Sequence, residues 1–288
     1  MWKPALRALA LAALPGVVLA ASPVATVTIV DGDAALLRDT AAFGLAEGVR
    51  LQKDDIVHTG AKGRFVRLEF ANGIVADLAP DTRLMLSPKA GKSTPQVYLL
   101  TGAVKLTVPA TFPAGDTVLA APSLELSAVA KGVVLSVSGG QTALFTESGA
   151  ATVVERQDFK PQQPVTLKTG QFYARTGNAK AQVTGRPTGA FIQSLPKAFL
   201  DTLPARLALF KGRDTAPKRA AEPSYADLQP WIDAEPVLRP LFVTRWRALA
   251  KRPDIRAGLV ADMAAHPEWD RTLFPEKYRP KPPASAVR

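Results

Sequence analysis

The chain of 288 residues contains no cysteine, only two histidines and few aromatic residues. The lack of cysteine excludes disulfide bonds, thiol catalysis, cysteine-ligated zinc and a lipid-modified cysteine anchor. The fold must therefore be stabilised by packing. His58 and His266 lie far apart in the sequence, and neither has a partner at metal-ligand spacing. We therefore expect no metal, no cofactor and no catalytic residue.

Long hydrophobic runs are also missing beyond the N-terminus. Lys3 and Arg7 precede an apolar stretch that is too short to span a bilayer and that ends in Val18-Leu19-Ala20. We interpret residues 1–20 as a cleaved secretory signal; an uncleaved N-terminal anchor is the alternative. No later stretch approaches membrane-spanning length, so we expect no transmembrane span after cleavage.

Acidic residues are outnumbered by basic ones, 25 against 36, which gives a formal net charge of +11. Outside the cytoplasm such a chain meets anionic polymers, carboxylated glycans and lipid headgroups rather than nucleic acid. An anionic polymer is therefore a candidate partner. The alternative is that so diffuse a charge serves solubility alone.

Residues 21–183 are composed of short segments in which apolar and polar residues alternate, separated by turn-forming residues. This period of two predicts a mainly β domain, either an antiparallel sandwich or roll or a solenoid. In RFVRLEFANGIVADL, Val66, Leu68 and Phe70 share one face, and Arg67 and Glu69 share the other. The Asn72-Gly73 pair predicts a two-residue type I′ turn, so we expect a hairpin buried on one side.

After Gly185 the pattern changes to prolines and helical spacing. We predict a connecting helical segment over 184–210, a polar and flexible linker over 211–223, and an α-helical region over 224–288 that includes one helix from Val237 to Lys251. The candidate partner-binding surface on that helix consists of Arg239, Arg245, Trp246, Arg247, Lys251 and Arg252. The alternative is a solvated helix face whose Trp246 belongs to the core.

The stretch LQKDDIVHTGAKGRFVRLEFANGIVADLAPDTRLMLSP resembles the FecR domain of bacterial envelope proteins. The matching positions are Leu51, Asp55, Val57, Thr59, Gly60, Leu68, Phe70, Gly73, Leu78, Pro80, Thr82, Leu84 and Leu86, followed by Leu99, Leu100, Gly102 and Val104. Asp54 stands where the family usually has Gly, and Asn72 stands where it usually has Asp. The resemblance covers residues 48–108 and fades by about Glu155.

This resemblance implies a periplasmic, non-catalytic, FecR-like binding or structural module of the cell envelope that takes part in signalling or envelope maintenance. FecR itself also has a cytoplasmic part that contacts a sigma factor and a membrane helix, and the resemblance does not extend to these parts. The partner would be an envelope component or a periplasmic or outer-membrane protein. The motif residues Asp55, Thr59, Gly60, Asn72, Gly73, Pro80 and Gly102 would have structural roles.

Two other hypotheses remain open on the sequence. One is an envelope glycan or peptide hydrolase that uses carboxylates such as Asp54 or Asp55. The other is a regulatory partner of a separate membrane-bound sigma regulator.

The signal interpretation predicts the N-terminus of the mature protein. When the whole chain is expressed in a bacterium with a periplasm, N-terminal sequencing of the exported protein should read Ala21-Ser22-Pro23. Intact mass measurement of a protein that retains residues 1–20 would contradict the prediction.

Overall fold

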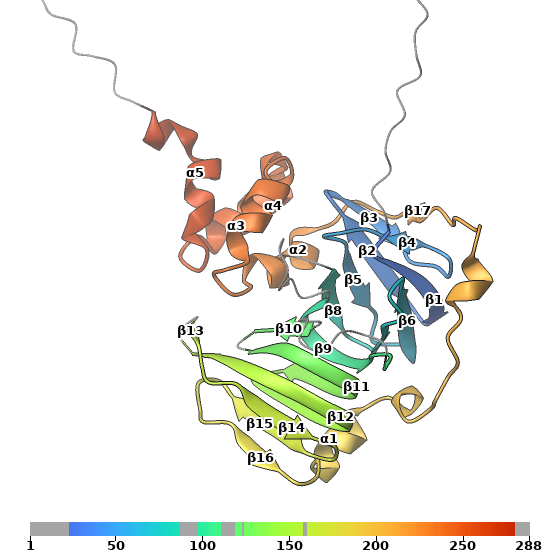
Figure 1. The fold of residues 1–288 in the computed structure, drawn as a ribbon. Coiled ribbons are helices and arrows are strands. Elements are labelled where there is room, and N and C mark those ends of the chain that lie inside the picture. Colours follow the sequence, from blue (N-terminus) through green and yellow to red (C-terminus); the bar gives the residue numbers. More distant parts are fainter. Residues whose placement is uncertain (1–22, 87–96, 111–118, 123, 158–159, 280–288) are drawn as a thin grey trace, which may run out of the picture.

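The computed structural model describes residues 23–86, 97–110, 119–122, 124–157 and 160–279. The predicted signal over 1–20 lies outside the described residues. The chain consists of a mainly β part followed by a helical C-terminal region, which confirms the predicted fold class (Figure 1). None of the described helices is long and apolar enough to cross a membrane.

The strands form two layers. In the first layer the strands pair antiparallel in the order β16, β15, β12, β11, β9, β7, β6 and β1, with β4 beside β1. Their bounds are β1 (Ala25–Asp31), β4 (Arg50–Leu51), β6 (Phe65–Phe70), β7 (Val75–Leu78), β9 (Val97–Thr107), β11 (Leu124–Ser138), β12 (Gln141–Gln157), β15 (Phe172–Thr176) and β16 (Gln182–Thr184).

The second layer has the order β17, β3, β2, β5, β8, β9, β10, β11, β12 and β14. Its pairs are antiparallel except β9 with β10. The additional strands are β2 (Ala34–Arg38), β3 (Ala41–Gly44), β5 (Ile56–Thr59), β8 (Arg83–Leu86), β10 (Leu119–Ala121), β14 (Val165–Lys168) and β17 (Lys218–Arg219). The short strand β13 (Lys160–Pro161) pairs antiparallel with the end of β12.

Three long strands, β9, β11 and β12, pass from one layer into the other. In β9, residues 97–101 pair with β8 and residues 104–107 pair with β7. Between them Gly102 adopts a φ of 95°, and Lys131 in β11 and its partner Gly149 in β12 also have positive φ. Left-handed residues bend a strand where it leaves one layer. The two layers are therefore two parts of one roll.

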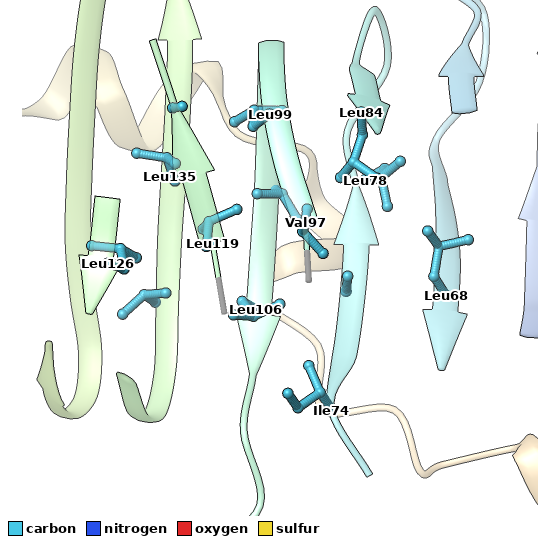
Figure 2. Packing of buried hydrophobic residues seen from close by; sticks show 14 of the residues in the cluster. Leu68, Ile74, Leu78, Leu84, Val97, Leu99, Leu106, Leu119, Leu126 and Leu135 are labelled. Atoms are coloured by element: carbon cyan, nitrogen blue, oxygen red, sulfur yellow. The ribbon is translucent and has the colours of Figure 1, made fainter. Parts of the chain in front are cut away.

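The main core lies inside this roll. It joins apolar side chains of the first layer, such as Leu68 and Leu106, to those of the second, such as Leu84 and Leu99. Figure 2 shows Leu99 and Leu106 on β9, with Leu84 and Leu68 on other strands of the roll. The alternation in the sequence thus identifies the inward face of each strand.

The turn after β6 differs from the prediction. Only Gly73 has a positive φ, whereas a type I′ turn would need one at Asn72 as well. Phe70 and Ile74 face each other across a three-residue loop, with Gly73 N donating to Phe70 O at 2.9 Å and Asn72 Oδ1 accepting from Ile74 N. The loop is a turn closed by a left-handed glycine, the second common way to close a hairpin.

We expected the polar face of the same hairpin to be exposed, but it is buried. Arg67 is 3% exposed and Glu69 is 2% exposed. Arg67 forms two hydrogen bonds with Asp77, at 2.6 and 2.8 Å, and donates to the carbonyls of Leu203 and Pro204. Glu69 accepts from Thr28 and from the backbone N–H groups of residues 206 and 207. The connecting segment covers this face, so the hairpin is buried on both sides.

The helices lie in the C-terminal part of the chain (Figure 1). They are α1 (Gly189–Ser194), α2 (Tyr225–Ile232), α3 (Arg239–Arg245), α4 (Pro253–Ala261) and α5 (Asp270–Leu273), with 3₁₀ turns η1 (Lys197–Phe199), η2 (Leu207–Phe210), η3 (Leu249–Lys251), η4 (Pro267–Trp269) and η5 (Pro275–Tyr278). One helix over 237–251 was predicted. The α-helix instead ends at Arg245, where the side chains of Arg245 and Trp246 bond to carbonyls of the β roll.

The predicted flexible linker over 211–223 is attached to the roll. Lys218 and Arg219 form β17 against β3, Ala220 N donates to Ala42 O, and Thr215 bridges Val49. The polar composition led to the linker prediction, but the backbone of this segment completes an open sheet edge. In Figure 1 the chain between α1 and α2, which contains this segment, runs along the outside of the roll.

The bend at Gly102 gives a test of this architecture. A Cβ at Gly102 would overlap Thr82 and lie 2.8 Å from Asp81 O, in addition to the strain of a positive φ. We expect Gly102→Ala to lower the free energy of unfolding by about 3 kcal/mol or more. Gly139→Ala is the matched control, because Gly139 also has a positive φ but a Cβ there meets nothing within 4 Å. Urea unfolding should show a loss of only about 1 kcal/mol in the control.

Candidate binding site

The second layer carries apolar side chains on its outward face as well. Leu37, Ile56, Met85, Tyr98 and Ala120 point away from the roll and form a second core with the C-terminal helices. Trp231 is central to this contact: its ring lies 6.5 Å from that of Tyr98 and 5.7 Å from that of Phe242. The helical region therefore covers the outer face of β2, β5, β8, β9 and β10.

Hydrogen bonds of the buried Glu235 side chain also join the β roll to the helical region. Glu235 accepts from Tyr98 OH at 2.8 Å and from Arg156 Nη2 at 2.9 Å, and Arg156 also binds Glu125. Burial, and then the charge of Glu235, raises the pKa of Tyr98 well above its ordinary value. Tyr98 consequently stays a neutral hydrogen-bond donor that links the roll to the helices.

The predicted partner-binding helix belongs to this interface. Arg245 donates to the carbonyls of Leu37, Asp39 and Asp54, and burial lowers its pKa below the ordinary arginine value. Trp246 is 1% exposed, stacks on Phe242 at 4.7 Å and donates to Asp39 O. Both side chains hold the helices on the roll instead of presenting a free surface, and the alternative placement of Trp246 in the core is the one observed.

Of the other four basic residues, two are bonded to other residues and two are exposed. Arg239 donates to the carbonyls of residues 234 and 265, and Arg252 binds Glu222 and Asp254. Arg247 and Lys251 are exposed, and no described residue pairs with either of them. Of the six predicted residues, only these two are open to a partner. The sequence pattern identified the helix correctly as basic but could not show which side faces the sheet.

The seven residues that were expected to have structural roles all have architectural contacts. Asp55 is 1% exposed and accepts from Arg38 at 2.6 and 2.9 Å and from Gln52 N. Thr59 Oγ1 donates to Ala79 O and accepts from Thr82 N. Gly60 N donates to Asp33 O, and the carbonyl of Pro80 accepts from Thr82 Oγ1. Asn72, Gly73 and Gly102 shape the turns described above.

Asp54, at the position where the FecR domains that this stretch resembles usually have glycine, has a φ of 66°. This left-handed conformation explains why glycine suits the position, and aspartate is among the residues that tolerate it. The carbonyl of Asp54 accepts from Arg245, so the turn is also the docking point for α3.

A recess lies at the border of the helical cover, and sequence reasoning missed it. His58 and Arg83 are direct cross-strand partners of β5 and β8, on the same outward face as Ile56 and Met85 but beyond the end of the apolar core. The recess has a volume of about 180 Å³. Its opposite wall comes from residues 220–223 and from α2, including Asp227 and Trp231. The alternation in β5 and β8 would have placed His58 and Arg83 on one face, but not beneath α2.

The charged groups of the recess are only partly satisfied. Neither His58 nor Arg83 has a hydrogen bond or ion pair in the described part of the chain, and both are half-buried. Burial, followed by the charge of Arg83, lowers the pKa of His58, while Asp227 and Asp81 act in the opposite direction. His58 is therefore neutral near pH 7. Among the described residues no group of three His, Cys, Asp or Glu could hold a metal ion.

A wider cleft of about 800 Å³ lies between α1 and the outer face of β9, β11, β12 and β15. Phe172 and Phe191 meet there with ring centroids 4.9 Å apart, and much of the rest of the wall consists of Ala, Ser, Thr and Gly. It brings together no unpaired cation and histidine, so the recess is the stronger candidate site.

No protein-family model matches the chain, and no curated protein matches it. Two crystal structures described as a putative anti-sigma factor from Parabacteroides distasonis are similar to it, each with a TM-score of 0.37 and 10% sequence identity. The similar part covers 46% of this chain and 59% of that chain, less than two thirds of its length. A likeness this distant does not indicate a shared partner.

The role of Arg245 as a clamp can be measured directly. Replacing it with alanine removes the charged donor that serves three carbonyls at the interface, so Arg245→Ala should lower the free energy of unfolding by about 3 kcal/mol. Arg247→Ala is the control two residues away, and its exposed side chain should change stability by about 0.5 kcal/mol or less. Equal effects in chemical denaturation would show that Arg245 is not part of the interface.

Proposed function

We propose that this chain is a periplasmic, non-catalytic, FecR-like binding module of the bacterial cell envelope. The observation that carries the proposal is that some polar side chains have partners within the fold and others do not. The motif residues and the buried charges take part in turns, strand pairing and ion pairs, whereas His58 and Arg83 of the recess have no hydrogen-bond or ion-pair partner among the residues that the structure describes. Such an arrangement suits the recognition of a ligand.

The placement of the two candidate carboxylates gives the hydrolase hypothesis no support. Asp55 is buried against Arg38, and Asp54 lies in a turn beside Lys53. A glycoside hydrolase needs two carboxyl groups that face one sugar across about 5–10 Å of open space. Neither carboxylate is presented in this way, so binding remains the better proposal.

An envelope component with negative charge is the partner that best fits the surface chemistry. The formal charge of +11 falls to +9 without Lys3 and Arg7 of the predicted signal, and Arg247 and Lys251 leave positive charge exposed on the helical region. Carboxylated or phosphorylated envelope polymers would be attracted by this charge at low salt. A periplasmic or outer-membrane protein with an acidic surface would be attracted in the same way.

Co-sedimentation with purified peptidoglycan and with outer-membrane fractions tests the proposal. We expect the wild-type protein to pellet with one of these fractions and the binding to weaken as salt is raised. Arg247→Glu/Lys251→Glu should reduce the bound fraction several-fold. Lys160→Glu/Lys168→Glu, which changes the total charge equally at exposed positions of the β roll, is the control and should retain binding.

Failure of the wild-type protein to pellet with either fraction would count against an envelope-binding role. Equal losses in both double variants would mean that only overall charge matters, and that the helical region is not the contact surface.

A further inference from the structure

The unpaired guanidinium of Arg83 is the first indication of what the recess could hold. Arginine carries five N–H donors in a planar fork that matches the two oxygens of a carboxylate. Two other arginines of the roll are each held by both oxygens of a carboxylate, Arg38 by Asp55 and Arg67 by Asp77. Arg83 has no such partner among the described residues. Its cross-strand neighbour His58 can donate a further hydrogen bond to a carboxylate bound there.

The opposite wall carries the complementary charge. Asp227 Oδ2 accepts from the backbone and side chain of Ser224, and its other oxygen makes no hydrogen bond in the described part of the chain. Glu222, on the same wall, is bound by Arg252 at 3.0 Å. Arg83 and Asp227 both influence the His58 ring, yet no ion pair joins them. The two charges therefore face one recess from different elements without neutralising each other.

The remaining walls limit the size and character of a ligand. Leu37, Ile56, Pro223 and Trp231 provide apolar surface between the two charged sides. A volume of about 180 Å³ is well below the roughly 300–1,000 Å³ of sites that hold drug-sized ligands. A short molecule with an aliphatic body and two oppositely charged groups bonded to the same carbon fits these limits.

We propose that the recess binds a zwitterionic molecule of about the size of one amino acid, with its carboxylate on Arg83 and His58 and its ammonium group on Asp227. This inference rests on the proposed function, because it names a ligand class for the same binding module. The ligand would lie between the β roll and α2, so that its binding joins the two regions.

The two histidines provide a readout with an internal control. His58 lines the recess, while His266 is fully buried between Asp233 and the carbonyl of Leu259. Side-chain NMR signals of isotopically labelled protein should be followed during millimolar titrations with L-alanine, L-leucine, N-acetyl-L-leucine and L-leucinamide. At least one of the free amino acids should move the His58 signals in a saturable manner and leave those of His266 unchanged.

The blocked probes separate the two charged contacts. N-acetyl-L-leucine lacks the ammonium group and L-leucinamide lacks the carboxylate, so each should bind about tenfold or more weakly than L-leucine. Arg83→Gln should weaken the binding of L-leucine by a similar factor. Asp227→Asn, which can still accept from Ser224, should make L-leucine and N-acetyl-L-leucine bind equally. Arg64→Gln removes an exposed arginine that pairs with Asp31 and should bind as the wild type does.

Several results would overturn the inference. These are no selective movement of the His58 signals with either free amino acid, unchanged affinity in Arg83→Gln, or equal affinity of the wild type for L-leucine and N-acetyl-L-leucine. Unchanged His266 signals in each variant show that the fold is intact. Co-sedimentation without amino acid binding would reject this inference alone, and amino acid binding without co-sedimentation would reject only the envelope role.

Discussion

Strands β5 and β8 are apolar on both faces, and the arrangement of the rest of the chain follows from that fact. Val57 and Leu84 point into the roll, and their neighbours Ile56 and Met85 point outward. A sheet with two apolar faces needs a cover on each side, because exposed apolar surface costs about 25 cal/mol per Å². The first layer supplies one cover, and the C-terminal helices supply the other. The recess lies at one end of this contact, where His58 and Arg83 of the sheet face α2 and residues 220–223.

The buried charged side chains of the first layer also need a cover, in this case one that supplies hydrogen bonds. Arg67, Asp77 and Glu69 occupy the outward face of the first layer, where the connecting segment covers them. Burial of a charge is tolerated only when it is paired or fully hydrogen-bonded. Here the backbone of residues 203–207 provides both carbonyl acceptors for the arginine and N–H donors for the glutamate. The chain uses main-chain groups of an irregular segment to satisfy side chains of a regular strand.

Much of the β roll could be predicted from local pattern, because alternation with period two identifies the inward face of a strand without knowledge of its partners. Val66, Leu68 and Phe70 were assigned to one apolar face in this way and lie in the main core. The details that failed depend on contacts between distant residues. Nothing near Arg67 in the sequence indicates that residues 203 and 204 will cover it, and nothing near Arg245 indicates the carbonyls of Leu37 and Asp54. The apolar runs IVHT and RLML could have signalled burial on both faces, and hence a second cover over this sheet.

The cover over Arg67 and Glu69 has a consequence for where this protein can be divided. The last strand of the first layer, β16, ends at Thr184, but the groups that satisfy Glu69 arrive more than twenty residues later, at residues 206 and 207. A fragment cut after β16 would expose a carboxylate and a guanidinium on a surface shaped to be covered, and the outer face of β5 and β8 would be bare as well. The cooperative folding unit therefore extends well past β16, and residues 206 and 207 must be synthesised before the hairpin of β6 and β7 can be covered on both faces.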